Sequence, residues 1–537
     1  MATDVLELLR PHQNIEKVTI KGYGGTQLPT WIGNPSFYKL VSLSLSNCKG
    51  CRILPSLETL TFTEMLEWED WLFGCDGDRE AFSIVLEIHL ECPKLRGKLH
   101  DVLHCLVKLV IYECQQLDSS LPRLPELHEL ELRRCNIRLI SNPREVTKLA
   151  SLQLYNLSNE YLPESFLQNL TTVERLIISG CFELLHLSRN KNELQYLTSL
   201  RRLVIRNCDL LVSLFEDGQK LPHGLEYVEL HSCHNLQKLP SLLHTLTSLE
   251  EVINTDCPRL ESFARKIFPS NLKGLAIQGC SVESLPESMM NKISYLEYLS
   301  LTIEKCLNLE FLHEGIMHSS NTSLQVLEIF DCSSISSFPG GQLPKTLKTL
   351  TVWNCFNLEA LHDIRTETMF LESLRVGNCT NLKNLPHGLH KLLNLNYLEV
   401  DGCHGIECFP EEGLPQNLTK VLILDCENMK SLPKWMQNLT SLEELQLSNC
   451  PSITSFPEGG FPTNLVSLDV KDCKNLMTMS EWGLHRLASL RRLTIHGISS
   501  NLSTFPERLL PSTLETLDII KLSNLESLSL DAKSHFT

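Results

Sequence analysis

The sequence predicts an α/β solenoid, a coil of short repeats that stack side by side around one elongated core. The first observation is the pattern L-x-x-L-x-L-x-x-C-x-x-I-x-x-F-P at residues 442–457, which recurs along the chain. The second is its spacing, because from residue 324 onward successive repeats begin 23 to 25 residues apart. The third is that most of the 21 cysteines fall at the same place in the pattern.

Each part of the repeat has a physical role. The L-x-x-L-x-L segment alternates apolar and polar residues, which is the period of a strand with one buried face. The cysteine then turns the chain, and residues such as 433–442 predict a short helix or 3₁₀ turn that leads to the next strand. One repeat cannot bury its apolar face alone, so neighbouring repeats must stack. This is the leucine-rich-repeat signature, and it predicts a horseshoe with one long parallel β-sheet on the concave face and loops or short helices on the convex face.

The spacing of the pattern also predicts the domain organisation. Residues 1–14 are expected to form a partial leading coil, which suggests that the chain is a piece of something longer. About 22 repeats follow over residues 15–530, and residues 531–537 are expected to be a tail. An irregular insertion at residues 63–83 interrupts the array, and we expect its tryptophans to pack on the solenoid.

Charge and hydropathy exclude two classes of partner. The chain has 537 residues and a net charge of −16, which argues against binding nucleic acid by neutralising phosphates. It contains no run of 18 or more apolar residues, so the sequence predicts no membrane span.

The cysteines predict the compartment. Seventeen of the 21 occupy the cysteine position of a repeat, or its nearest equivalent, rather than the irregular spacing of a disulfide framework. A thiol there acts as a small hydrophobe and a weak hydrogen-bond donor to the turning backbone. Because that role needs reduced thiols, and because the N-terminus does not resemble a secretion signal, we expect a cytoplasmic or nuclear protein.

Motifs for catalysis are missing from the sequence. It contains no G-x-x-x-x-G-K-[ST], no H-E-x-x-H and no G-x-S-x-G. The 19 histidines share no ligand spacing with the cysteines, so no zinc site is expected. We therefore expect a protein that is not an enzyme and that holds no cofactor or metal.

The concave surface is the expected binding site. The residue two positions before each cysteine should face solvent, and neighbouring strands should lie about 5 Å apart. This row places Tyr112, Arg133 and Tyr155 on successive coils, and Phe330 and Trp353 on two others. Tyr, Trp and Arg are enriched at binding hot spots. The alternative is that these side chains only pack on one another along the sheet.

A basic group on adjacent coils gives a third candidate. Arg202 and Arg206 lie near Arg175 and Arg201 in an otherwise acidic protein. The group could receive an acidic segment of a partner, or it could pair with glutamates on the same surface.

Several stretches resemble the leucine-rich-repeat region of plant nucleotide-binding leucine-rich-repeat immune receptors of the coiled-coil subclass. They are residues 9–25, 28–33, 41–49, 68–71 and 432–445. The resemblance covers essentially the full chain. It implies a module that recognises a pathogen effector or a guarded host protein and that restrains a receptor's nucleotide-binding domain.

The resemblance also has limits. The sequence has no P-loop, so the nucleotide switch of such receptors is not expected here. The main alternative is a substrate adaptor for a ubiquitin ligase or another scaffold, which would need a docking helix such as an F-box. An extracellular repeat receptor would need a signal peptide and L-x-G-x-I-P segments, and neither is present.

Overall fold

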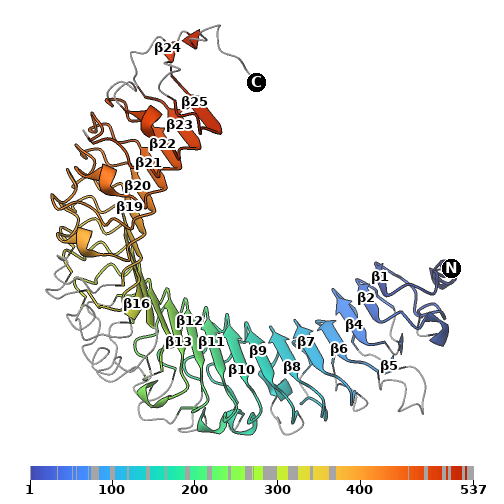
Figure 1. Cartoon of the computed structure of the whole chain (residues 1–537). Helices are drawn as coiled ribbons and strands as arrows, with labels where there is room; N and C mark the ends of the chain where they lie inside the picture. Colours follow the sequence, from blue (N-terminus) through green and yellow to red (C-terminus); the bar gives the residue numbers. More distant parts are fainter. Residues whose placement is uncertain are drawn as a thin grey trace. The chain divides into compact units, whose positions relative to one another are not determined.

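The structure is a computed structural model (Figure 1) that divides into two compact units. The N-terminal unit comprises residues 1–260 and 266–269, and the C-terminal unit comprises residues 261–265 and 270–537. The described residues are 2–32, 34–50, 53–55, 57–69, 72–73, 84–96, 99, 103–117, 120–140, 146–163, 166–187, 194–214, 221–239, 243–260, 269, 271–281, 299–312, 324–338, 343–361, 370–457, 459–476, 482–498, 504–505, 510–522 and 527–528.

The N-terminal unit begins with helix α1 (Ala2–Leu8) and is built on a parallel sheet in which neighbours along the chain pair in register (Figure 1). Its strands are β1 (Lys17–Lys21), β2 (Ser42–Ser46), β4 (Thr59–Thr63), β6 (Glu87–Glu91), β7 (Lys108–Tyr112), β8 (Glu129–Arg133), β9 (Ser151–Tyr155), β10 (Arg175–Ser179), β11 (Arg202–Arg206), β12 (Tyr227–His231) and β13 (Glu251–Thr255). A short pair, β3 (Ile53–Leu54) and β5 (Leu72–Phe73), lies outside this sheet. The 3₁₀ helices are η1 (Pro35–Phe37), η2 (Ile137–Ile140), η4 (Leu167–Asn169), η5 (Leu194–Tyr196) and η6 (Leu243–Thr245).

The C-terminal unit has the same construction. Its strands are β14 (Gly274–Gln278), β15 (Leu299–Glu304), β16 (Leu324–Phe330), β17 (Thr349–Trp353), β18 (Ser373–Gly377), β19 (Tyr397–Asp401), β20 (Lys420–Leu424), β21 (Glu444–Ser448), β22 (Ser467–Lys471), β23 (Arg492–His496) and β25 (Thr516–Ile520). The register of the pairing between β15 and β16 shifts between Leu299 and Ser300. A short pair, β24 (Thr504–Phe505) and β26 (Ser527–Leu528), lies apart from the sheet. The 3₁₀ helices are η9 (Leu389–Lys391), η10 (Met436–Asn438) and η12 (Leu484–Arg486).

The alternation within the repeat produces the core. In β21, Leu445 and Leu447 are 1% and 0% exposed, whereas the three residues that alternate with them are half-buried. Because each apolar residue meets its counterpart on the next strand in register, the buried rows are continuous within each unit. The prediction of a leucine-rich-repeat solenoid with a parallel sheet and few helices is confirmed.

The residue before most of the repeat cysteines closes the turn in a left-handed conformation. Asp331, Asn354 and Asn378 have φ of 54°, 56° and 50°. The amide of Asn354 donates to Asp331 Oδ1 at 2.7 Å, and that of Asn378 donates to Asn354 Oδ1 at 2.8 Å. Asn and Asp tolerate this conformation best among residues with a side chain. The next residue in this row of hydrogen-bonded side chains is Gly402. A side chain does not fit there, because a Cβ would lie 2.2 Å from Asn378 Oδ1.

The cysteines form a buried row beneath this turn, as the sequence predicts. Cys379 Sγ lies 3.4 Å from the carbonyl oxygen of Gly377 and 3.9 Å from that of Val352 on the preceding strand. Burial raises the pKa of the Cys135 thiol to about 12, which keeps it protonated. The repeat cysteines are buried and form no disulfide, namely residues 48, 92, 114, 135, 181, 208, 233, 257, 280, 306, 332, 355, 379, 403, 426, 450 and 473.

This arrangement predicts which thiols react in the folded protein. Cys408 is exposed and Cys105 is half-buried, so both should be alkylated by iodoacetamide, Cys408 faster. The buried row should be labelled only after unfolding. Peptide mapping by mass spectrometry measures this, and rapid native labelling of Cys379 or Cys426 would contradict the packing.

Trp68 connects the start of the predicted insertion to the core. Its side chain is 0% exposed, and its ring centroid lies 5.2 Å from that of Phe62. Its indole N–H donates to the carbonyl oxygen of Cys48 at 3.1 Å. Residues 70–71 and 74–83 of the expected insertion, with Trp71, lie outside the described residues, as does the expected tail at 531–537.

A search of the described residues finds no helix with the length and apolar character needed to cross a membrane.

Candidate functional site

The strand face is the surface made by the residues of each sheet strand that alternate with the buried core residues and point away from the core. The sequence-predicted residues lie on it in two separate units. Tyr112, Arg133 and Tyr155 are aligned in register as the fifth residues of β7, β8 and β9. Phe330 and Trp353 are aligned in the same way as the last residues of β16 and β17.

The group Tyr112, Arg133 and Tyr155 is already held by its neighbours. The Arg133 guanidinium carbon lies 4.3 Å from the Tyr155 ring centroid, and its Nε pairs with Glu131 on the same strand. The Tyr155 hydroxyl donates to Gln153 Oε1 at 2.9 Å. This group therefore presents an ordered and partly neutralised surface, and packing along the sheet explains part of it.

A hollow that sequence reasoning missed borders this group. It encloses about 560 Å³ at the ends of β8 and β9. Arg134, which pairs with Glu113 at 2.7 Å, and Asn156 directly follow Arg133 and Tyr155 in the chain. The hollow is lined by Gln115, Arg134, Cys135, Asn136, Asn156, Ser158, Asn159 and Phe182. It could accept a polar side chain from a molecule that lies on the strand face.

The basic group consists of Arg175, Arg201, Arg202 and Arg206. Some of these arginines pair with glutamates on the same surface, and others are left for an acidic segment of a partner. Arg201 pairs with Glu226 at 2.6 Å, and Arg206 pairs with Glu229 at 2.6 Å. Arg202 instead stacks on an aromatic ring, with its guanidinium carbon 3.7 Å from the centroid of Tyr227. Arg201 and Arg206 are thus neutralised within the surface, whereas Arg202 is held mainly by stacking.

Tyr227 and Glu229 contact this basic group, and the row two residues before cysteine could not show them. Both lie on β12, and the Tyr227 hydroxyl donates to Glu229 Oε2 at 2.9 Å. Burial, together with this bond, raises the pKa of Tyr227 to about 12. The sequence signal was available, because Tyr-x-Glu at the first and third strand positions recurs in β19.

Buried apolar side chains lie on the strand face beside Arg202. Ile177 and Val204 occupy the third strand position, yet they are 5% and 1% exposed. Arg175 is aligned with Arg202 across β10 and β11, and within the described chain it has no ion pair. Two adjacent arginines above an apolar floor suit a partner segment that is both acidic and apolar.

The group Phe330 and Trp353 is shaped by a glycine on the next strand. A Cβ built on Gly377 would lie 2.4, 2.4 and 2.5 Å from three atoms of the Trp353 ring. Nearly equal distances to three ring atoms mean that the indole lies flat over the backbone of Gly377. Trp353 is therefore partly buried by a close approach that only glycine permits.

An ion pair supports this tryptophan from the neighbouring strands. The Arg375 guanidinium carbon lies 5.7 Å from the Trp353 ring, and its Nε donates to Glu399 Oε2 at 2.7 Å. The Tyr397 hydroxyl also donates to Glu399, at 3.0 Å. Burial raises the pKa of Tyr397 to about 12, with Glu399 adding to the effect. The hydrogen bond to Glu399 raises the pKa of Arg375, so the Arg375 guanidinium is paired with the Glu399 carboxylate.

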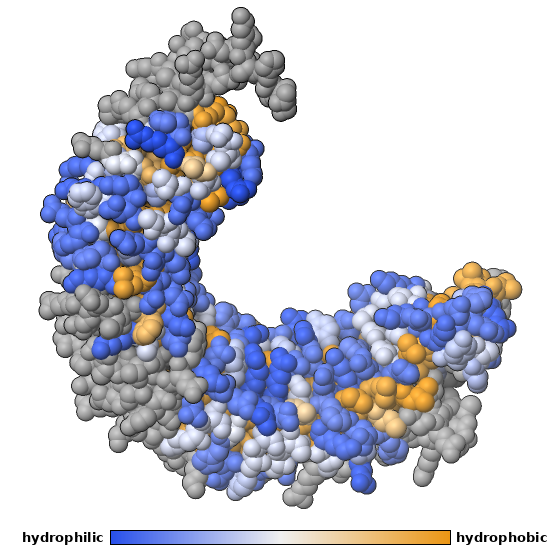
Figure 2. All heavy atoms as spheres, viewed as in Figure 1, coloured by the Kyte–Doolittle hydropathy of each residue, from blue (hydrophilic) through white to orange (hydrophobic). Residues whose placement is uncertain are grey.

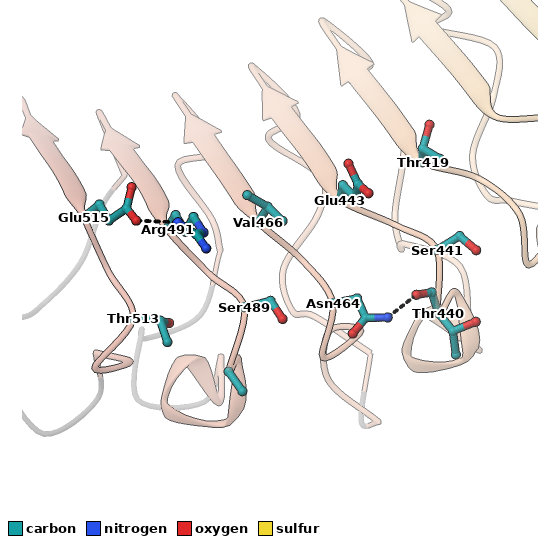
Figure 3. A pocket seen from close by; sticks show the side chains of 11 residues that line it. Thr419, Thr440, Ser441, Glu443, Asn464, Val466, Ser489, Arg491, Thr513 and Glu515 are labelled. Atoms are coloured by element: carbon teal, nitrogen blue, oxygen red, sulfur yellow. Dashed lines mark hydrogen bonds and ion pairs between the residues drawn. The ribbon is translucent and has the colours of Figure 1, made fainter.

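A second hollow lies away from the predicted residues, on the side where the strands of the C-terminal unit begin (Figure 3). It encloses about 900 Å³ and is open and polar. Arg491 pairs with Glu515 across it at 2.6 Å, and Asn464 Nδ2 donates to the Thr440 carbonyl oxygen at 2.6 Å (Figure 3). These two interactions satisfy part of its polar lining.

The face of the described residues that Figure 2 shows has no dominant apolar region. Hydrophilic residues cover most of the visible face of each unit, and apolar residues appear in small groups (Figure 2). Within the described residues, no cluster of three or more His, Cys, Asp or Glu side chains is placed to hold a metal ion.

Two families match separate parts of the chain. The family described as R13L1/DRL21 LRRs matches residues 1–71. The family described as plant disease resistance protein RPS2-like, leucine-rich repeats, matches residues 143–307.

The chain is also similar to curated plant proteins. Disease resistance RPP13-like protein 1 of Arabidopsis thaliana is 27% identical over 47% of this chain and 24% of its own length. Disease resistance protein At3g14460 of the same plant is 28% identical over 76% of this chain and 41% of its own length. The chain thus spans less than half the length of these relatives.

A solved structure of YopM from Yersinia enterocolitica aligns over 98% of this chain and 93% of that chain, with 19% identity and a TM-score of 0.43. The family matches and the named relatives agree with each other and with the resemblance seen in the sequence. The chain is a leucine-rich-repeat protein related to the repeat regions of plant nucleotide-binding disease resistance proteins.

Proposed function

We propose that this chain is a protein-recognition module of plant innate immunity, which binds a pathogen effector or a host partner protein through its strand face. The observation that carries the proposal is the alignment of aromatic and arginine side chains on that face in a relative of disease resistance proteins. Such side chains supply most of the binding energy in protein interfaces.

The repeat explains why recognition belongs on this face. The buried leucine and cysteine positions are alike in every coil, so they cannot distinguish one partner from another. The strand face instead changes from coil to coil, as the row Phe330, Trp353, Gly377 and Asp401 shows. A partner that lies across several coils meets a distinct set of side chains.

The same proposal includes a compartment and a class. A row of buried, free thiols suits a reducing environment, which supports the cytoplasm or the nucleus. The matched repeat families are typically interaction modules without enzymatic activity, which supports a role in binding rather than catalysis.

Proximity labelling in plant cells tests this function with two matched triple variants. The strand-face variant replaces Tyr155, Phe330 and Trp353 with alanine. The control replaces three exposed residues outside the sheets, Tyr38, Phe370 and Trp435, which are 70%, 55% and 58% exposed. We expect a set of labelled proteins that the strand-face variant loses by about tenfold or more and that the control keeps.

The opposite result would remove the proposal. If both triple variants label the same proteins to the same extent as the wild type, the strand face is not the recognition surface.

A further inference from the structure

An acidic and aromatic row crosses the strand face of the C-terminal unit. The last strand positions align Phe330, Trp353, Gly377 and Asp401 on β16 to β19, and Leu424 follows on β20. Within this row Asp401 is the only charged side chain.

Asp401 is a carboxylate that its surroundings leave unsatisfied. Within the described residues its side chain has neither an ion pair nor a hydrogen bond. Partial burial raises its pKa, and the nearby carboxylates of Asp425 and Glu399 raise it further. Arg375 on the neighbouring strand β18 is bound by Glu399 at 2.7 Å rather than by Asp401. The carboxylate of Asp401 is therefore left without a cationic partner among the described residues.

Trp353 supplies a ring surface beside this carboxylate. One face of the indole lies on Gly377, which has no side chain to stand between the ring and β19. Strands two apart are separated by about 10 Å, and the flat ring covers the first half of that span. Asp401 is aligned with Gly377 on the next strand, so the ring and the carboxylate are neighbours on the strand face.

A carboxylate beside an aromatic ring suits a cationic group. A cation over a tryptophan face gains electrostatic attraction, and a carboxylate gives a charge-assisted hydrogen bond.

We propose that Trp353 and Asp401 form a receptor for one lysine or arginine side chain of a partner protein. The proposal rests on the proposed function and adds the chemistry of the partner, which is a basic segment. The net charge of −16 favours such a partner over an acidic one.

A labelled peptide tests the receptor directly. The probe is a fluorescein-labelled glycine-serine peptide with two arginines, and its control carries citrulline, which keeps the shape but lacks the charge. Fluorescence anisotropy at low ionic strength measures both. We expect Asp401→Asn and Trp353→Leu each to weaken binding of the arginine peptide by about fivefold or more. The citrulline peptide should bind weakly to every variant.

A matched variant separates the receptor from the general charge of the protein. Glu411 has a side chain that is 91% exposed and lies outside the sheet. Glu411→Gln removes the same charge as Asp401→Asn and should change affinity by less than about twofold. The receptor is refuted if Asp401→Asn binds like the wild type, if Glu411→Gln loses as much, or if citrulline binds equally well.

A stability measurement guards against loss of fold. Asp401→Asn should unfold at the same temperature as the wild type or slightly higher, because it removes a partly buried charge that faces two other carboxylates. A marked fall would instead make Asp401 a structural residue and overturn the receptor.

The two proposals fail separately. If the arginine peptide ignores Asp401 while the triple strand-face variant still loses its labelled proteins, the receptor is wrong and the recognition function stands. If binding of the arginine peptide depends on Asp401 and Trp353 but the set of labelled proteins does not depend on the strand face, the receptor stands and the proposed recognition function is wrong.

Discussion

Replacing Trp68 with alanine is expected to destabilise the first coils of the N-terminal unit by about 3–5 kcal/mol. The indole is fully buried against Phe62, and its N–H satisfies the carbonyl oxygen of Cys48. Its removal leaves a cavity and an unpaired buried acceptor at the same place. Because each coil of a solenoid contacts mainly its neighbours, the effect should be local.

Alkylation of Cys48 in the native protein provides the local measurement. We expect Cys48 to react much faster in the Trp68→Ala variant than in the wild type, while Cys450 stays protected. Trp435→Ala is the control, because that side chain is 58% exposed and its loss should change stability by about 0.5 kcal/mol or less. Equal protection of Cys48 in all three proteins would show that Trp68 does not hold these coils together.

Replacing both Phe330 and Trp353 with alanine is expected to reduce the free energy of binding to a captured partner by about 2 kcal/mol or more. This corresponds to a Kd that is roughly thirtyfold higher. The two side chains lie side by side on β16 and β17, and Trp353 is fixed in place by Gly377 and Arg375. A ring that is already ordered loses little conformational entropy on binding.

Titration calorimetry with the purified partner measures this effect. The matched control replaces Phe370 and Trp435, which are exposed outside the sheet. Circular dichroism must show that the double variant retains its fold. Unchanged affinity in a folded double variant would exclude this group from the interface.

The fold could be predicted from the sequence because its determinants are local and repeated. Each strand needs only its own alternating leucines, as in β21, and each cysteine returns at the same place. The left-handed residue before the cysteine was less visible, because Glu113, Arg134 and Lys305 adopt the same conformation as Asn354. Backbone hydrogen bonds between coils impose that turn whatever the residue type.

The site was only partly predictable because it depends on contacts between coils. The sequence places Trp353 on the strand face. Its flat packing, however, requires Gly377, which follows 24 residues later in the chain. Likewise, Arg206 and Glu229 are 23 residues apart and meet only through the register of β11 and β12. A list of exposed positions therefore identifies candidates, but it does not show which of them are already occupied by neighbours.

Hydroxyl-radical footprinting of the protein with and without its partner tests the central claim most directly, because it reports the accessibility of individual aromatic side chains. Binding through the strand face predicts strong protection of Tyr155, Phe330 or Trp353, with no change at Tyr38 and Trp435 outside the sheets. Protection of Tyr38 or Trp435 while all three strand-face rings keep their reactivity would contradict the claim.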